Sequence, residues 1–249
     1  MSDDIQTLVD RLPRLGEALV VTLELTIGGA LLAAVVAFLL GFGSRAQSLW
    51  VRGPSRAVVE FFRGTSLVVQ LFWIFYVLPV FGYEMQALAV GIVALGLNYG
   101  AYGSEVVRGS IESVPKGQWE AATALNLSWL HRVRRVIFPQ AWALMIPMLA
   151  NLLIQLLKGS ALAYYITLHD LNYWTDQLRR STNDVFFSYT VGLLGYFAIA
   201  YLLTWGMNYL EERAKRRLGR GTKRPSVREA LRVKPDVRPE VITGKGGAA

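Results

Sequence analysis

The chain has 249 residues, of which 53% are hydrophobic, with a mean hydropathy of +0.34 and a formal charge of +8. This composition is too apolar for an ordinary soluble domain and is typical of a polytopic membrane protein. The chain contains no cysteine, which excludes disulfides, zinc–thiolate sites and thiol nucleophiles.

Five apolar stretches are each long enough to cross the hydrocarbon core of a bilayer, which takes about 20 residues. They lie near residues 18–42, 59–82, 86–107, 137–158 and 187–210. The sequence therefore predicts an all-α integral membrane protein whose transmembrane domain covers residues 18–210. Residues 1–17 lack the basic segment of a secretion signal directly before the first stretch, so we expect them to remain as an external N-terminal segment.

The distribution of Lys and Arg predicts the orientation of these spans. With the N-terminus outside, the segments that face the cytosol carry 20 Lys and Arg and the external segments carry 4. Cytosolic loops are enriched in these residues, so we expect an N-out, C-in topology.

Polar side chains inside the predicted spans are candidates for a substrate pathway, because such groups are costly in lipid and usually face a bundle interior or a pathway. They are Gln70, Asn98, Asn151, Gln155 and Lys158. The last three are spaced by four and three residues, so they share one face of a helix. Hydrogen bonding between helices explains Gln70 and Asn98 at least as well as a lining role. The face from residue 151 to 158 favours a lining role, with Lys158 reaching the outer interface as the alternative.

Residues 113–136, between the third and fourth spans, read as two short amphipathic helices joined by a turn. One apolar face is predicted by residues that recur at mostly three- and four-residue steps, namely Trp119, Ala122, Leu130, Val133 and Ile137. Asn126 is suited to the left-handed conformation that ends a helix, and Ser128 is placed to cap the next one. The sequence therefore predicts a structured helical hairpin on the cytosolic side.

The external segment 159–186 contains the pair His169 and Asp170, which raises the question of general-base or metal chemistry. No third ligand stands at a suitable spacing, so we interpret the pair as structural and predict no catalytic residue and no metal site. The Tyr and Trp residues of this segment are typical of a membrane-interface belt, and an aromatic cage for a cation is the alternative.

The C-terminal tail carries most of the net charge. Residues 211–249 hold 12 Lys and Arg against 5 Asp and Glu, and the part from residue 221 onward is rich in Pro, Gly and charge. We expect this tail to be largely disordered and to lie beside anionic membrane lipid, with no nucleic-acid partner.

The hairpin resembles the EAA loop of ABC importer permeases, whose pattern is Glu-Ala-Ala, three residues, then Gly. Here the pattern reads Glu120, Ala121, Ala122 and, after three residues, Asn126 in place of Gly. The stretches 59–72, 104–122, 138–141 and 151–163 resemble the polar amino-acid (histidine/glutamine-type) branch of that family. Leu152 and Gly159 stand where this branch commonly has acidic residues. The resemblance covers roughly residues 18–215.

This resemblance implies a type I ABC permease core of five transmembrane helices (MetI-like) in the bacterial inner membrane. It implies a second permease subunit, identical or different, a cytosolic ABC ATPase dimer and an extracytoplasmic solute-binding protein. The coupling residues that it implies are Glu120, Ala121, Ala122, Leu125 and Asn126. The chain itself has no phosphate-binding motif, since its only Gly-Lys pair is Gly244-Lys245, followed by Gly246. We therefore expect no cofactor on this chain, no enzyme activity of its own, and ATP with magnesium to be used by the partner ATPase.

The substrate implied by the resemblance is a polar amino acid. A compatible solute such as ectoine or hydroxyectoine is the alternative, because Leu152 and Gly159 change the local charge. An autonomous secondary transporter or channel is the alternative function, but it predicts inverted repeats or paired intramembrane charges, which the sequence does not show. An intramembrane enzyme needs a catalytic constellation at one depth, and both histidines lie outside the predicted spans.

Overall fold

The computed structural model describes residues 2–217, and every element within that range is helical. The α-helices are α1 (Ser2–Gly43), α2 (Leu49–Gly64), α3 (Leu67–Phe72), α4 (Ala87–Glu112), α5 (Lys116–Ala124), α6 (Trp129–His131), α7 (Phe138–Ser160), α8 (Leu171–Thr182) and α9 (Val185–Arg217). Residues 2–217 also contain four short helical segments: the π-helices η1 (Trp73–Val77) and η3 (Arg132–Ile137) and the 3₁₀ helices η2 (Leu78–Phe81) and η4 (Ala161–Ile166). The disorder predicted for residues 221–249 lies outside the described residues.

Within residues 2–217, four helices are long and apolar enough to cross a membrane: Gln6–Gly43, Ala87–Glu112, Trp129–Ile166 and Val185–Arg216. A fifth crossing exists only if the bent pair Leu49–Gly64 and Leu67–Phe81 is counted as one broken span. The helical core predicted from the sequence is therefore confirmed, with one difference in its second span.

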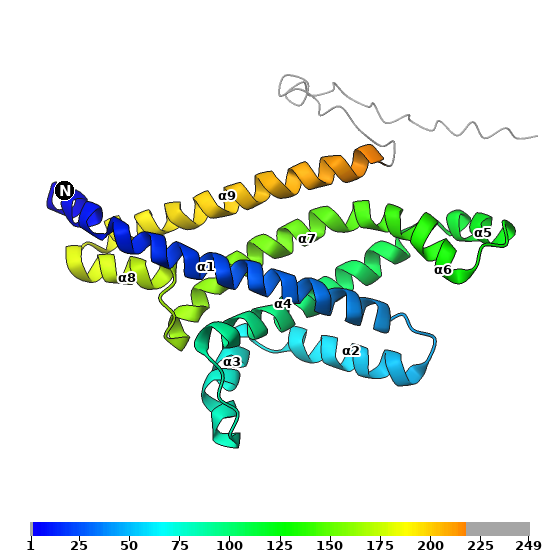
Figure 1. The fold of residues 1–249 in the computed structure, drawn as a ribbon, viewed down its shortest axis with the longest axis horizontal. Helices are drawn as coiled ribbons and strands as arrows, with labels where there is room; N and C mark the ends of the chain where they lie inside the picture. The colour runs from blue at the N-terminus through cyan, green and yellow to red at the C-terminus, as the bar shows by residue number, and fades with distance from the viewer. Residues whose placement is uncertain (1, 218–249) are drawn as a thin grey trace, which may run out of the picture.

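The second predicted span, residues 59–82, is not a continuous helix. Its two halves meet at an angle of 102°, and Thr65 and Ser66 between them have extended backbone. Hydropathy records only how apolar a stretch is, so it does not detect such a bend. Figure 1 shows the second half, from α3 to η2, turning away from the axis of the bundle.

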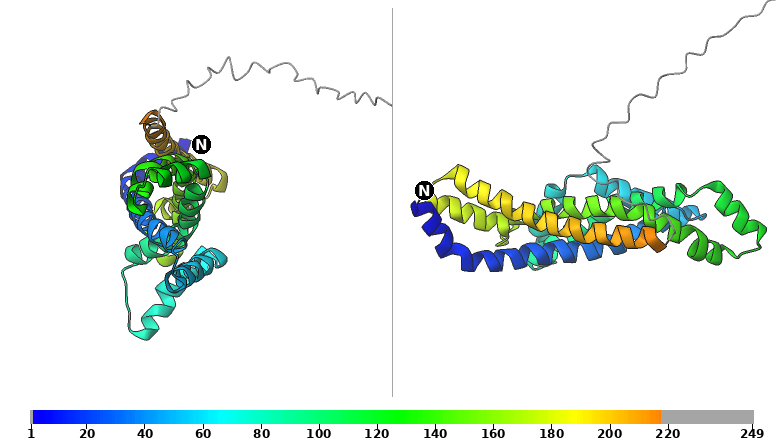
Figure 2. Two further views of the ribbon diagram at one scale, coloured as in Figure 1. Left: turned by 90° about the vertical axis from the view of Figure 1, so that its right-hand side faces the viewer. Right: turned by 90° about the horizontal axis from the view of Figure 1, so that it is seen from above.

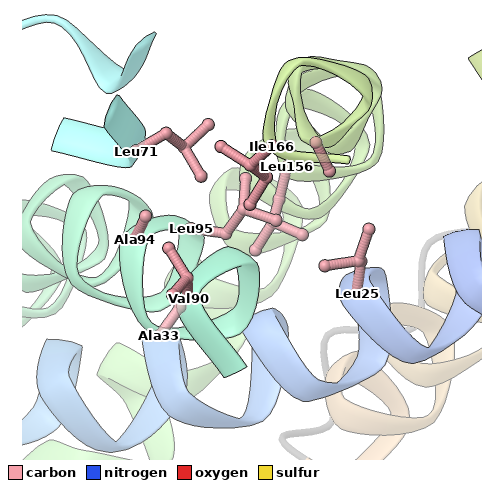
Figure 3. Packing of buried hydrophobic residues seen from close by; sticks show 9 residues of the cluster. Leu25, Ala33, Leu71, Val90, Ala94, Leu95, Leu156 and Ile166 are labelled. Carbon is pink, nitrogen blue, oxygen red and sulfur yellow. The ribbon is translucent and has the colours of Figure 1, made fainter. Parts of the chain in front are cut away.

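Helices α1, α4 and α7 form the centre of the bundle. Leu25 of α1, Leu95 of α4 and Leu156 of α7 are almost completely buried and pack in one cluster (Figure 3). Along the α1–α4 contact, a Cβ atom at Gly96 or Gly100 would come within 2.6 Å of an α1 side chain. Small residues of this kind let two membrane helices approach closely.

The two ends of the bundle carry different structures. Helices α5 and α6 project beyond one end, and α8 lies at the other end beside the start of α1 and α9 (Figures 1 and 2). The indole of Trp174 in α8 donates to the carbonyl of Arg11 at 3.2 Å, and the amide of Leu171 donates to Thr22 Oγ1 at 3.0 Å. Residues 2–17, predicted as an external segment, therefore continue α1 as helix and are held by α8.

Candidate functional site

The turn between α5 and α6 is fixed by its backbone. Asn126 has φ 51°, the left-handed conformation expected from the sequence. Its amide donates to the carbonyl of Thr123, and the amide of Leu127 donates to the carbonyl of Ala122. These two bonds form a Schellman motif, which satisfies carbonyls at the end of a helix.

Ser128 stands at the N-cap position of α6, as predicted, but its hydroxyl does not bond the backbone of that helix. It lies 2.9 Å from Nδ1 of His131 instead. The prediction of a side-chain cap by Ser128 is therefore wrong, because the imidazole of His131, one turn later, competes for the hydroxyl.

The hairpin formed by α5 and α6 is anchored to the bundle along one side. Ala122 is buried, and Trp119 packs on a cluster that includes Val107, Ile111 and Ile137. Two hydrogen bonds strengthen this anchoring: Gln140 in α7 donates to Gln118 at 3.2 Å, and Arg132 donates to Thr123 at 2.7 Å. The hairpin is thus held in a defined orientation.

The opposite side of the hairpin exposes an apolar tip. Leu125, Trp129 and Leu130 are 73%, 61% and 63% exposed. Glu120 and Ala121 are exposed as well, and Glu120 forms no ion pair with any residue from 2 to 217. An exposed group of large apolar side chains beside a free carboxylate is typical of a protein-binding surface.

Leu130 was predicted to share one apolar face with Trp119 and Ala122, but it is 63% exposed and lies at the tip of the hairpin. The chain reverses direction at Asn126, so a helical period counted from Trp119 does not continue into α6. The other members of the predicted face, Trp119, Ala122, Val133 and Ile137, are partly or fully buried.

A continuous helix links the hairpin tip to the centre of the bundle. Trp129–Ile166 runs through α6, η3, α7 and η4 as one apolar helix of 38 residues, about 57 Å at 1.5 Å per residue. The π-helical turn η3 lies where Pro139 has no amide hydrogen for the carbonyl of Arg135. The amide of Phe138 donates there to the carbonyl of Val133, five residues back. The tip of the hairpin and α7 therefore belong to one helical segment.

The break in the second span is stabilised by two side-chain amides. Gln70 Nε2 donates to the carbonyl of Phe62 at 3.0 Å and to Thr65 Oγ1 at 2.7 Å. Asn98 Nδ2 donates to the same Phe62 carbonyl at 3.1 Å and to Gln70 Oε1 at 3.2 Å. Both amides are buried, and Phe62 lies in the last turn of α2, where carbonyls have no helical partner. The structure thus brings Gln70 and Asn98 together as a link between helices, and such partners are what make a helix break tolerable in a membrane.

Asn151, Gln155 and Lys158 share one exposed face of α7, as their spacing predicted. Their side chains form no hydrogen bond with any described residue, although the carbonyl of Gln155 accepts from the hydroxyl of Tyr99 at 2.8 Å. No hydrogen bond joins this face to the Gln70–Asn98 pair within residues 2–217. An exposed polar face at membrane depth requires water or a partner beside it.

A charged network links the α1–α2 loop to α4, at the same end of the bundle as the hairpin. Arg108 pairs with Glu105 at 2.6 Å and with Glu112 at 2.8 Å. Glu112 also pairs with Arg45 at 2.9 Å. This last pair was missed, because its partners are 67 residues apart and no local pattern connects them.

Asp170 is hydrogen-bonded to residues of α8 and α9, and no hydrogen bond joins its side chain to His169 within residues 2–217. Its buried carboxylate accepts from the amide of Tyr173 at 3.0 Å, which caps α8, and from the hydroxyl of Tyr196 at 3.2 Å. Burial raises the pKa of this carboxyl to about 6, although these hydrogen bonds act in the opposite direction. His169 is exposed and stacks on the ring of Tyr173, with ring centres 4.1 Å apart. Within residues 2–217, no three His, Asp or Glu side chains lie close enough to hold a metal ion.

Comparison with protein families adds a finding that covers most of the chain. Residues 33–216 match the family described as "Binding-protein-dependent transport system inner membrane component". The chain is 42% identical over 213 residues to a "Probable amino-acid ABC transporter permease protein y4tF" of Sinorhizobium fredii, covering 83% of this chain and 90% of the relative. It is 33% identical to the "L-cystine transport system permease protein TcyB" of Bacillus subtilis, with 82% and 88% covered.

Solved structures show the same architecture. The crystal structure of an amino acid ABC transporter with histidines superposes with a TM-score of 0.78 at 29% identity, covering 84% of this chain and 97% of that chain. An inward-facing structure of the MetNI methionine ABC transporter superposes with a TM-score of 0.72. It covers 82% of this chain and 98% of that chain, and its 18% identity supports the fold alone.

Proposed function

The chain belongs to the family of binding-protein-dependent transport system inner membrane components as an amino-acid ABC permease of importer type, and we propose that its hairpin couples transport to a separate ATPase. The bundle spans the inner membrane several times and moves substrate by alternating access. The hairpin faces the cytosol, which gives the N-out, C-in topology expected from the charge distribution.

The observation that carries this proposal is the form of the hairpin. It presents an apolar tip, Leu125, Trp129 and Leu130, beside the unpaired carboxylate of Glu120. It is anchored on its other side and continues into α7 without a break. A partner that binds the tip would therefore displace the polar face of α7. Glu120, Ala121, Ala122, Leu125 and Asn126 are the proposed coupling residues, with Ala122 and Asn126 shaping the hairpin.

The proposed partners follow from the family. They are a cytosolic ABC ATPase dimer that hydrolyses ATP with magnesium, a second permease subunit and an extracytoplasmic solute-binding protein. The chain contributes the transmembrane pathway. Its sequence has no phosphate-binding motif, so we assign ATP hydrolysis to the partner ATPase.

The proposed substrate is a small amino-acid zwitterion, as the names of the two relatives suggest for those proteins. The α7 face supplies two amides and one cation, Asn151, Gln155 and Lys158, which suit a carboxylate and polar groups. Gln70 and Asn98 act on the broken span rather than on the substrate. Neither relative is named for ectoine, and the structure offers no feature that favours it.

Co-purification from native membranes tests the coupling. We expect a P-loop ATPase to accompany the wild-type chain and to be lost from the Glu120→Lys and Leu125→Asp variants. Glu84→Lys is the matched control, since Glu84 is an exposed carboxylate outside the hairpin, in the connection before α4. An ATPase that accompanies all four proteins equally would remove these residues from the interface. An ATPase absent from every preparation of folded protein would favour an autonomous transporter.

A further inference from the structure

An apolar groove with a volume of about 790 Å³ lies between α1, α7 and α9. Its walls include Phe38 of α1, Trp142 and Ile146 of α7, and Met207 and Leu210 of α9. The groove lies near the end of the bundle that carries the hairpin, since Phe138 and Pro139 also line it. We call it the α7–α9 groove.

One charge lines this otherwise apolar groove. Arg213, near the end of α9, is exposed and forms no ion pair with any residue in the described range. The neighbouring Lys215 and Arg216 are paired along the helix with Glu211 and Glu212. The α7–α9 groove therefore combines an apolar surface with one unpaired guanidinium. This combination is complementary to a molecule with a hydrocarbon chain and an anionic headgroup.

The groove opens on the side of α7 opposite to the polar face proposed for transport. At 3.6 residues per turn, Asn151, Gln155 and Lys158 lie about 180° around the helix from Trp142, Ile146 and Leu149. Figures 1 and 2 likewise place α9 and the arm formed by α3 to η2 on opposite sides of the bundle. Outward from the groove, α9 exposes large apolar side chains such as Leu202 and Trp205. This is the composition of a surface that faces lipid.

Charge argues against the chain's own tail as the occupant. Residues 218–249 carry 8 Lys and Arg against 3 Asp and Glu, so Arg213 repels this segment on average.

We propose that the α7–α9 groove is a binding site for one anionic phospholipid. A hydrocarbon chain lies against Phe38, Trp142 and Leu210, and the phosphate accepts hydrogen bonds from the guanidinium of Arg213. The site prefers a headgroup with net negative charge, because a zwitterionic headgroup carries a cation that Arg213 repels. The proposal requires only that the chain lies in the membrane and does not depend on the coupling role of the hairpin.

Trp142 provides a direct probe, because bromine atoms on a lipid chain quench tryptophan on contact and Trp142 is 37% exposed in the groove. The full chain is placed in nanodiscs that contain brominated phosphatidylglycerol or brominated phosphatidylcholine. The signal of Trp142 is the difference between wild type and Trp142→Phe, since the chain has 7 tryptophans. Trp205, 70% exposed on α9, gives the reference for general lipid contact through Trp205→Phe.

We expect Trp142 to be half-quenched at about a five-fold lower mole fraction of phosphatidylglycerol than of phosphatidylcholine, the preference that one surface cation supplies, whereas Trp205 shows no preference. Arg213→Gln should abolish the preference and Arg213→Lys should keep it. Arg216→Gln is the matched control and should keep it as well, because Arg216 does not line the groove.

Two results would overturn the proposal. Equal quenching of Trp142 by both lipids in the wild-type chain would mean that the groove holds bulk lipid without selection. No quenching by either lipid would mean that protein, such as a second copy of the chain, covers the groove.

Discussion

Gln70 and Asn98 use their amide groups to stabilise a broken helix. Their hydrogen bonds converge on the carbonyl of Phe62, which the break at Thr65 leaves without a helical partner. Polar residues inside a membrane span are readily interpreted as ligand-binding groups, and the sequence alone does not distinguish that role from this one. The two roles can be told apart only when it is known which backbone carbonyls the bend leaves without a helical hydrogen bond.

Asn98→Leu should lower the stability of the folded chain. It removes two hydrogen bonds and leaves the Oε1 atom of Gln70 without its Asn98 donor, so we expect a loss of about 1–3 kcal/mol. The matched substitution Asn151→Leu removes an exposed amide with no described side-chain hydrogen bond and should change stability by less than about 0.5 kcal/mol. Thermal unfolding in detergent measures both. Transport should show the reverse order, relative to the amount of folded protein, if Asn151 faces the pathway. Equal losses of stability would contradict the assigned role of Asn98.

Asp170 predicts a pH dependence of stability. Its pKa is about 6 in the folded chain, against an ordinary value of 3.8, so the folded chain binds a proton more readily than the unfolded chain between these values. The free energy of unfolding should therefore fall by about 2 kcal/mol as pH rises from ~4 to ~6. Asp170→Asn keeps an oxygen for the amide of Tyr173 and removes the titration. We expect the melting temperature of the wild type to decrease more steeply over this range than that of the variant, and parallel curves would refute the assignment.

At the scale of elements, the hairpin shows what local sequence rules can and cannot predict. The left-handed Asn126, the α5–turn–α6 order and the buried Ala122 all follow from patterns within a few residues. The exposure of Leu130 does not follow, because it depends on the direction in which α6 leaves the turn. The bend of the second span and the Arg45–Glu112 pair likewise arise from contacts between distant segments.

The turn itself can be tested through Asn126. Asn126→Gly should leave the hairpin intact or slightly more stable, because glycine adopts positive φ without steric cost. Asn126→Val should destabilise the turn by at least about 1–2 kcal/mol, since a β-branched residue is poorly tolerated at φ 51°. Capture of the ATPase measures the consequence: the Gly variant should retain it, and the Val variant should lose part of it. Equal capture by both variants would show that the turn geometry does not govern docking.

At the scale of the whole molecule, the two ends of the bundle differ in structure. One end carries the projecting hairpin and the charged network, and the other carries α8 held against the start of α1. Four of the five apolar crossings predicted from hydropathy are continuous helices in residues 2–217, because burial in lipid acts on whole segments, whereas the other is the bent pair Leu49–Gly64 and Leu67–Phe81. The relation of the ends to the two membrane faces rests on the distribution of Lys and Arg.

The proposed orientation can be measured directly, because the natural chain contains no cysteine. Single Leu125→Cys and Ser181→Cys variants place a thiol at exposed positions on the hairpin and on α8. A membrane-impermeant maleimide should label the Ser181→Cys variant in cells with a permeable outer envelope and an intact inner membrane. The Leu125→Cys variant should be labelled only after the inner membrane is opened. The opposite pattern would invert the topology.

The most direct test of the central claim is uptake into liposomes that contain the chain with its co-purified subunits and the cognate binding protein. A panel of radiolabelled amino acids that includes L-cystine would serve as substrates. We predict uptake of at least one of them that requires ATP, the ATPase and the intact hairpin, and that is lost in the Glu120→Lys variant while Glu84→Lys retains it. Uptake by the chain alone, without ATP or ATPase, would contradict the account and identify an autonomous transporter.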